Sequence, residues 1–134
     1  MQWIKKGQIY NDCHAQVPVV DTQHDGFWRV YFSKRISRGP SLPFYIDVEA
    51  GNPSNILATS NEPILQPGAR GTFDWAGVMP TEIITIGSTK YLFYIGWSNR
   101  HDVPYHNNLG LAISTDGGIT WKKFSDGPVL ATSY

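Results

Sequence analysis

The sequence predicts an all-β fold made of two similar four-stranded antiparallel units. Three observations lead to it. Glycine (13) and proline (9) are frequent in the 134 residues and only 16% are charged, so helix formers are sparse. Short runs of β-branched and aromatic residues alternate with Gly, Pro, Asn and Asp turns. The two halves of the chain also resemble each other, and a hydrophobic fraction of 41% is enough to build a core.

The internal repeat aligns residues 33–65 with residues 98–130 at an offset of 65, without a gap. Upstream, Val17-Pro18 matches Met79-Pro80 at an offset of 62, and the three-residue difference falls in a turn, where length changes cost little. The identical pairs are Ser33/Ser98, Arg35/Arg100, Ser60/Ser125, Pro63/Pro128 and Leu65/Leu130.

Each unit is expected to contain four short strands. Asp25-Gly26, Gly87-Ser88 and Asp116-Gly117-Gly118 are typical of the turns between paired strands. The strands of the first unit are predicted at 15–20, 27–33, 44–49 and 55–59, and those of the second at 79–86, 91–97, 109–114 and 120–124.

Four-stranded units repeated in tandem are typical of β-propeller blades. We expect one partial propeller domain over residues 1–134, with blade one at 11–68 and blade two at 69–134. Residues 1–10 are expected to form a lone outer strand, because Trp3-Ile4-Lys5-Lys6 resembles Trp121-Lys122-Lys123. Two blades leave sheet faces and edges uncovered, so the ring is incomplete unless copies of the chain assemble.

The segment from Ser114 to Trp121 fits the Asp-box, Ser-x-Asp-x-Gly-x-Thr-Trp. Asp116 could be read as a catalytic residue. The structural interpretation is favoured, because an Asp carboxylate accepts backbone N–H bonds inside a tight hairpin and the glycines permit positive φ.

The topology of an antiparallel blade places the Asp-box hairpin at one end and the candidate ligand-binding segments at the other. These segments are 11–14, 33–43, 70–77 and 98–108, which are rich in polar and aromatic side chains. Segments that lead into the innermost strands should lie nearest the axis, which favours His14 and Asp74.

Several stretches resemble the five-bladed propellers related to glycoside hydrolase families 43, 32 and 130. The stretches are His14-Ala15-Gln16-Val17-Pro18, Pro63-Ile64-Leu65, Gly71-Thr72-Phe73-Asp74, Gly77-Val78-Met79-Pro80, Tyr94-Ile95-Gly96-Trp97, Pro104-Tyr105, Gly110-Leu111-Ala112-Ile113-Ser114 and Gly127-Pro128-Val129-Leu130. The resemblance covers nearly the whole chain but only the first two blades of five. Five such units would need about 325 residues.

The resemblance implies carboxylates at the axial ends of inner strands. Glycoside hydrolysis needs an acid together with a base or nucleophile, and the resemblance places the acid on blades beyond these two. Asp74 is the best candidate catalytic carboxylate, and its structural alternative is a loop Asp that accepts backbone N–H bonds. Asp12 does not align with the Asp in the first blade of that family. The Glu82 side chain either faces the central channel of the propeller or lies in solvent.

Candidate substrate-binding residues are polar or aromatic side chains at the expected ligand end. For each a structural role is the alternative: Arg35 and Arg100 could instead bond between blades, and the aromatic residues, Trp97 among them, could be blade packing. The candidates are His14, Arg35, Trp75, Arg100, His101 and Tyr105.

Composition argues against several other functions. The net charge of 0 gives no electrostatic footprint for nucleic acid or an anionic membrane. His101 and His106 have no matched third metal ligand, and Cys13, the single cysteine, has no identifiable partner for nucleophilic catalysis. We expect no metal and no cofactor. We also expect a cytoplasmic protein, since the N-terminus lacks the apolar stretch of a signal peptide and no run of about 18 apolar residues occurs.

Three functional hypotheses follow. The chain could be a propeller enzyme acting on glycosidic bonds, a non-catalytic carbohydrate-binding or self-assembling module, or a truncated gene product that survives by self-association. We favour a glycoside hydrolase-like protein that is inactive as an isolated two-blade chain and forms a homo-oligomer, a dimer or a trimer.

Overall fold

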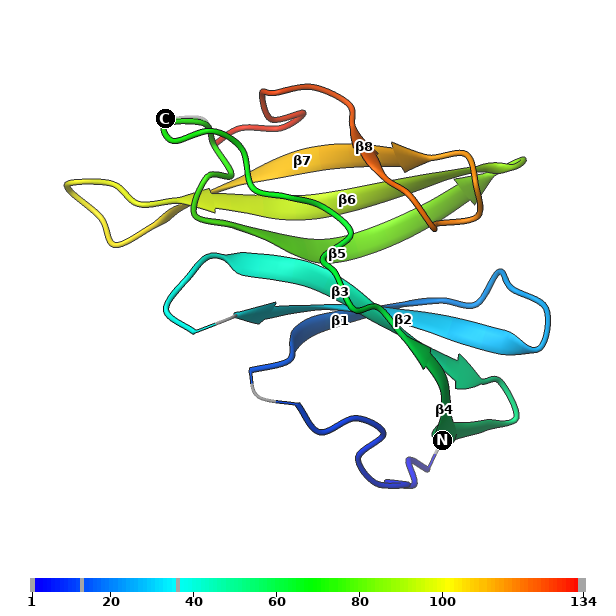
Figure 1. The fold of residues 1–134 in the computed structure, drawn as a ribbon. Coiled ribbons are helices and arrows are strands. Elements are labelled where there is room, and N and C mark those ends of the chain that lie inside the picture. The colour runs from blue at the N-terminus through cyan, green and yellow to red at the C-terminus, as the bar shows by residue number, and fades with distance from the viewer. Residues whose placement is uncertain (1, 13, 36, 133–134) are drawn as a thin grey trace.

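The computed structural model describes residues 2–12, 14–35 and 37–132, and these contain strands and loops but no helix. The fold is all-β, as predicted, with eight strands in an open arrangement (Figure 1). Blade one contains β1 (Gln16–Asp21), β2 (Phe27–Arg35), β3 (Ser41–Glu49) and β4 (Asn52–Thr59). Blade two contains β5 (Gly77–Ile86), β6 (Thr89–Ser98), β7 (His106–Ser114) and β8 (Lys122–Lys123).

Within each blade the strands pair antiparallel in chain order. The two blades are joined by a single parallel pair, Ser41 with Gly77. The sheet does not close, so the fold is that of propeller-like blades in an incomplete ring.

The repeat is present, but the uniform offset of 65 is wrong for the middle strands. An offset of 65 from the pair Ser33–Pro43 predicts that Ser98 pairs with Asn108, whereas Ser98 pairs with His106. The physical reason is loop length, because the β2–β3 connection spans 36–40 and the β6–β7 connection spans 99–105, two residues more. Arg35 therefore ends a strand, whereas Arg100 lies in a loop, and the two are not equivalent.

The outer segments of the two units make corresponding hydrogen bonds, with donors 65 positions apart as expected and acceptors 66 apart. The Ile64 N–H donates to the Pro43 carbonyl at 2.9 Å, and the Val129 N–H donates to the Leu109 carbonyl at 2.8 Å. Each innermost strand also has one irregularity in register, beside Pro18 in β1 and after Pro80 in β5. Proline has no N–H for the ladder, so it is accommodated where the ladder is interrupted.

The N-terminal segment, residues 2–12, forms no strand in this structure. Tyr10 packs against blade one, with its ring centroid 5.1 Å from that of Phe32, while Trp3 and Ile4 are 90% and 70% exposed. An outer strand needs a partner edge for its hydrogen bonds, so an outer-strand role for 1–10 remains a prediction.

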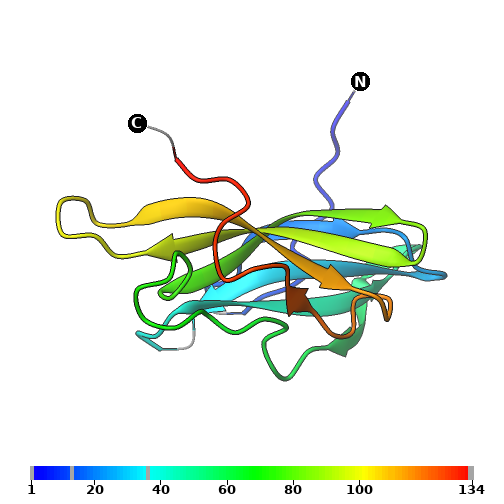
Figure 2. The same ribbon diagram turned by 90° about the horizontal axis from the view of Figure 1, so that it is seen from above.

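Two apolar clusters stabilise the fold, one in each blade. In the view from above (Figure 2), the strands of blade two lie over those of blade one. In blade one the cluster lies on the face turned away from blade two. It consists of Val30, Phe32, Phe44, Ile46 and Val48. In blade two it lies on the face turned toward blade one and the 60–76 connection. It consists of Leu65, Val78, Leu92, Tyr94 and Ala112.

No helix long and apolar enough to span a membrane occurs among the described residues.

Candidate functional site

The polar connections that the sequence assigns to one end of the blades do lie together. In Figure 1 the β2–β3 and β6–β7 connections are at the left, with the loop that leads into β5, whereas the β7–β8 turn is at the right. We call the left end the ligand end. Alternating antiparallel strands produce this division, because successive connections must lie at opposite ends.

One cleft at the ligand end, which we call the main cleft because both Trp75 and Arg100 line it, has a volume of about 490 Å³. A groove of about 610 Å³ beside it shares Asn108, Ala131 and Thr132. The main cleft is bounded by 71–73 and Trp75 of the loop before β5, by 98–100 at the end of β6, and by Pro128, Ala131 and Thr132 of the C-terminal segment. Trp75, Arg100, His106 and Asn108 contribute side chains to its wall. Its size falls within the range of small-molecule sites.

A polar network organises one wall of this cleft. Arg100 Nη2 lies 3.3 Å from His106 Nδ1, and Asn108 Nδ2 lies 3.1 Å from the same nitrogen. A guanidinium can only donate, so Nδ1 accepts and Nε2 carries the proton. His106 Nε2 accordingly donates to Thr132 Oγ1 at 2.7 Å. The network joins the loop after β6, the start of β7 and the C-terminal segment.

Two smaller clefts continue from the main one, the first beside it and the second beside the first. One, of about 380 Å³, shares Trp75 with the main cleft and is also lined by Arg35 and Trp97. The other, of about 260 Å³, has Arg35, Trp97 and Tyr105 together with Gln16 of the innermost strand β1. The Arg35 guanidinium lies over the Trp97 ring at 5.4 Å. Arg35, Trp75, Arg100 and Tyr105 of the predicted set thus line one connected surface.

Asp74, the predicted catalytic carboxylate, does not line these clefts. It is 1% exposed and its carboxylate points into blade two. Its Oδ2 accepts a hydrogen bond from Lys123 Nζ at 2.5 Å and lies 3.3 Å from the Tyr94 hydroxyl, while Thr72 Oγ1 donates to Oδ1 at 3.1 Å. Burial and the neighbouring Asp74 raise the pKa of Tyr94, so that hydroxyl remains a donor. This geometry supports the structural alternative, although the partners are side chains rather than the expected backbone groups.

Other candidates lie elsewhere. His14 is exposed in the turn before β1, with a positive φ of 60°, and His101 is exposed in the β6–β7 connection. Neither contributes to the walls of the three clefts. Asp12 accepts hydrogen bonds from Tyr10 and Lys34 at 3.0 Å each, and Glu82 is exposed and bonds to the Ile83 N–H.

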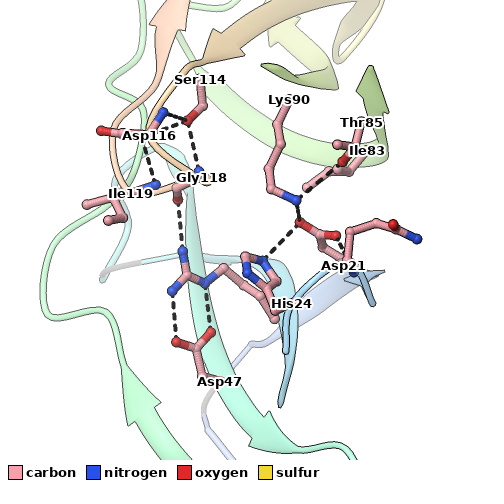
Figure 3. A network of polar contacts seen from close by, with 12 residues as sticks. Asp21, His24, Asp47, Ile83, Thr85, Lys90, Ser114, Asp116, Gly118 and Ile119 are labelled. Carbon is pink, nitrogen blue, oxygen red and sulfur yellow. Dashed lines mark hydrogen bonds and ion pairs between the residues drawn. The ribbon is translucent and has the colours of Figure 1, made fainter. Parts of the chain in front are cut away.

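Asp116 closes the β7–β8 turn at the end opposite the clefts. Its carboxylate accepts hydrogen bonds from the Ser114 side chain and the Ile119 backbone N–H (Figure 3). It also accepts hydrogen bonds from the side chain and the backbone N–H of Thr120. These bonds, with those from Thr120 the strongest, lower the pKa of Asp116. Gly117 and Gly118 have φ of 75° and 87°, which glycine adopts readily. The expected structural role of Asp116 is therefore observed.

A buried polar contact between the blades was not anticipated from the sequence. Arg29 donates from Nε and Nη2 to both oxygens of Asp47, at 2.7 and 2.8 Å, and from Nη1 to the Gly118 carbonyl at 3.0 Å (Figure 3). Nearby, Lys90 of blade two pairs with Asp21 of blade one at 2.6 Å. The Gly118 carbonyl, in the turn that Asp116 closes, thus points toward blade one.

Asn99, Asn108 and Thr132 line the main cleft but were not among the predicted binding residues. Polar residues next to a strand end carry no distinctive signal, and Thr132 reaches the cleft only because the C-terminal segment folds back along β7. Among the described residues, no three His, Cys, Asp or Glu side chains are grouped to hold a metal ion. Cys13 lies outside the described residues.

Comparison with solved structures finds two that share this fold. The chain superposes on a Parabacteroides distasonis protein proposed to be a glycoside hydrolase, with a TM-score of 0.59 and 22% identity over 86% of this chain and 32% of that one. It also superposes on a structure from glycoside hydrolase family 130, a family of mannoside phosphorylases containing hydrolases that target β-1,2-mannosidic linkages in Candida mannan. The TM-score is 0.67, with 23% identity over 90% of this chain and 33% of the other. At such identities the likeness establishes the fold alone.

In sequence, the chain is similar to two Mycobacterium tuberculosis proteins, Uncharacterized protein MT1551 (strain CDC 1551 / Oshkosh) and Uncharacterized protein Rv1502 (strain ATCC 25618 / H37Rv). Each is 36% identical over 139 residues, covering 98% of this chain and 46% of the relative. The chain therefore spans about half the length of these relatives. No protein-family model matches it.

Proposed function

We propose that the chain is a carbohydrate-binding module of glycoside hydrolase-like fold, without hydrolytic activity as an isolated two-blade chain. The observation that carries the proposal is the main cleft of about 490 Å³, where Trp75 lies with Arg100, His106 and Asn108. A sugar offers hydroxyl groups to donors and acceptors and an apolar C–H face to an aromatic ring. The wall of this cleft supplies partners for both.

The clefts support binding more than hydrolysis. Hydrolysis requires two carboxyl groups about 5 to 10 Å apart on either side of the bond. The linings of the main cleft and its two neighbours include neither Asp nor Glu among the described residues. Asp74, the closest candidate in sequence, is held by Lys123 inside the blade.

Calorimetric titration of the 134-residue chain with soluble oligosaccharides tests the binding proposal. The panel includes β-1,2-mannobiose, because the family 130 neighbour belongs to a family with members that act on that linkage. We expect at least one sugar to bind, and Trp75→Ala and Arg100→Ala to weaken it at least tenfold, about 1.4 kcal/mol each. Trp3→Ala is the matched control, since Trp3 is 90% exposed on the N-terminal segment.

Two results would contradict the proposal. One is the absence of binding to every sugar of the panel at millimolar concentration. The other is binding that persists unchanged in both cleft variants. The same samples, incubated with aryl glycosides, are expected to release no phenol above background, and turnover that disappears in Asp74→Asn would restore the hydrolase hypothesis.

A further inference from the structure

The cleft of about 380 Å³ lies where the two blades meet at the ligand end, and we call it the inter-blade cleft. Blade one contributes the end of β2 and the connection that follows it, and blade two contributes the loop before β5 and the end of β6. Its largest side chains are Arg35 and Arg38 from blade one and Trp75 and Trp97 from blade two. Neither the N-terminal nor the C-terminal segment lines it, so the two blades build this cleft between themselves.

Strand register holds the two sides of the inter-blade cleft together. Arg35 pairs with Ser41 across β2 and β3, and Ser41 pairs with Gly77 across the junction between the blades. Gly77 pairs in turn with Trp97 across β5 and β6. A Cβ on Gly77 would collide with the Trp97 indole, so the ring occupies the space that glycine leaves. The Arg35 guanidinium lies 5.4 Å from the centroid of that ring, so an arginine of one blade rests against a ring held by the other.

The arginines of the clefts have no carboxylate partner. Arg35, Arg38 and Arg100 line the inter-blade cleft or its neighbours, and in the part of the chain that the structure describes none of them forms an ion pair. The buried and half-buried cations of the chain, by contrast, each pair with an aspartate, and they are Arg29, Lys34, Lys90 and Lys123. The clefts therefore carry a local positive charge in a chain whose net charge is 0.

Acidic side chains near the ligand end do not cancel this charge. Asp12 pairs with Lys34 at 3.0 Å, and Asp74 is buried in blade two with Lys123. Asp102 lies exposed in the β6–β7 connection and lines none of the three clefts. An anionic ligand would thus meet cations on the described walls of these clefts without a competing carboxylate.

The side chains of the inter-blade cleft suit a carboxylate attached to a sugar ring. A guanidinium presents parallel N–H donors that match the two oxygens of a carboxylate. Trp75 lines both the main cleft and the inter-blade cleft, so a sugar ring stacked on it would reach both. A uronate carries its carboxylate directly on the pyranose ring. One such residue can therefore contact an indole and a guanidinium together.

We propose that the inter-blade cleft is a subsite for the carboxylate of an acidic sugar, a uronate, which Arg35 and Arg38 bind while Trp75 contacts the sugar ring. This inference rests on the sugar binding proposed for the main cleft, and it names the class of sugar. The Arg35 side chain already lies against Trp97, so less conformational freedom is lost when it binds the ligand.

Calorimetric titration of the 134-residue chain with trigalacturonate and triglucuronate, each beside its methyl ester, tests the inference. Acid and ester share the same sugars and linkages and differ in charge. We expect at least one acid to bind at least tenfold more tightly than its ester at low ionic strength. Added salt should reduce this preference, because the arginines are exposed and their charges are screened.

Variants assign the preference to the inter-blade cleft. Arg35→Gln and Arg38→Gln should each weaken binding of the acid about tenfold, while affinity for the ester changes less than twofold. Arg35→Lys keeps the charge but loses the planar fork, so it should recover only part of the loss. Lys122→Gln is the matched control, because it removes one positive charge at an exposed position of β8 that lines none of the three clefts. Circular dichroism checks that each variant is folded.

Each outcome separates this inference from the proposed function. Binding of neutral sugars or esters without a preference for the acid overturns the inference and leaves the proposed function standing. Binding of neither kind of sugar overturns both. A preference for the acid that persists in folded Arg35→Gln and Arg38→Gln, or that Lys122→Gln removes equally, overturns the assignment to this cleft. Inorganic phosphate or mannose 6-phosphate that binds more tightly than either uronate would assign the arginines to a phosphate group, against the carboxylate proposed.

Discussion

Arg29 and Asp47 form a bidentate ion pair on the face of blade one that contacts blade two, with N–O distances of 2.7 and 2.8 Å. Both side chains are about nine-tenths buried. The remaining guanidinium nitrogen bonds to the Gly118 carbonyl, and the Tyr45 ring lies 3.9 Å from the guanidinium carbon. Burial opposes the charge on Arg29, but the bonds to Asp47 outweigh it and raise the pKa of Arg29 further. The pair therefore links the two blades through one cation.

Asp47→Ala should destabilise the chain strongly. Removing the carboxylate leaves the Arg29 charge buried without its partner, which costs about 3 to 5 kcal/mol of unfolding free energy. Chemical denaturation measures the loss, and Asp25→Ala, at an exposed position in the β1–β2 turn, is the control. Replacing both members, as in Arg29→Met with Asp47→Leu, should recover much of the loss because no charge is then left unpaired. An effect of Asp47→Ala no larger than that of Asp25→Ala would contradict the role given to the pair.

His24 should make stability depend on pH in the mildly acidic range. Burial lowers the pKa of His24, and the charges of Lys90 and Arg29 add to this, while Asp21 opposes it. The unfolded chain then binds the proton more readily than the folded chain, so stability is complete above about pH 6.5 and falls as the pH drops through and below that value. The slope is at most about 1.4 kcal/mol per pH unit for one group. His24→Phe should flatten the profile of unfolding free energy between pH 7.5 and 5, and a profile equal to that of the unmodified chain would refute the assignment.

The strands and turns could be predicted from the sequence because their signals are local. Alternation, β-branched residues and Gly-rich turns located the β2, β6 and β7 strands, and the Ser114–Trp121 pattern identified the role of Asp116. The antiparallel order also predicted that the 33–43, 70–77 and 98–108 segments lie at one end of the blades, opposite the turn that Asp116 closes. Each of these inferences uses neighbours only a few residues apart in the chain.

The contacts that decide the roles of the charged residues could not be predicted in the same way. Arg29 meets Gly118 across 89 positions, Lys90 meets Asp21 across 69, and Lys123 meets Asp74 across 49. Nothing in the local pattern distinguishes a carboxylate that will face a cleft from one that will be buried by a returning loop. The predicted equivalence of Arg35 and Arg100 was wrong for a related reason. The β2–β3 and β6–β7 connections differ in length by two residues, and a gapless alignment of identical residues on either side does not reveal such a difference.

Gly96→Ala should disturb the loop that builds the main cleft. A Cβ at this position would lie 2.5 Å from Asp74 Cβ and 2.6 Å from Phe73 Cδ2, so the 71–75 segment would have to move. Overpacking of this kind costs about 1 to 3 kcal/mol, and it should also weaken sugar binding by shifting Trp75. Thermal unfolding and titration measure the two effects. Gly51→Ala is the control, since a Cβ there meets nothing within 4 Å, and an unchanged affinity in Gly96→Ala would show that the loop does not hold the cleft.

Lys123→Met should lower the free energy of unfolding more than Asp74→Asn does. A difference in this direction is expected if Asp74 is a buried structural residue. The Asp74 side chain is 2% exposed and that of Lys123 is 20% exposed. Removing Lys123 leaves a buried carboxylate without its cation, which costs about 3 kcal/mol or more. Removing the Asp74 charge leaves an ammonium that can turn to water, while the amide retains hydrogen-bonding capacity toward Thr72 and Tyr94, so about 1 to 2 kcal/mol is expected.

The same pair of variants separates stability from ligand binding. With Asp74 inside the blade, Asp74→Asn should lower the midpoint of urea unfolding while leaving sugar affinity within about twofold of the unmodified chain, measured well below the unfolding transition. A catalytic or ligand-contacting Asp74 would give the reverse pattern, a large loss of affinity or turnover with little change in the midpoint. Because Lys123→Met keeps the carboxylate but removes its cation, a loss of affinity in that variant alone would mean that the unpaired carboxylate has moved toward the cleft. The order of the urea midpoints of Asp74→Asn and Lys123→Met therefore tests whether Asp74 is buried. The sugar affinities of the two variants test whether Asp74 is separate from the main cleft.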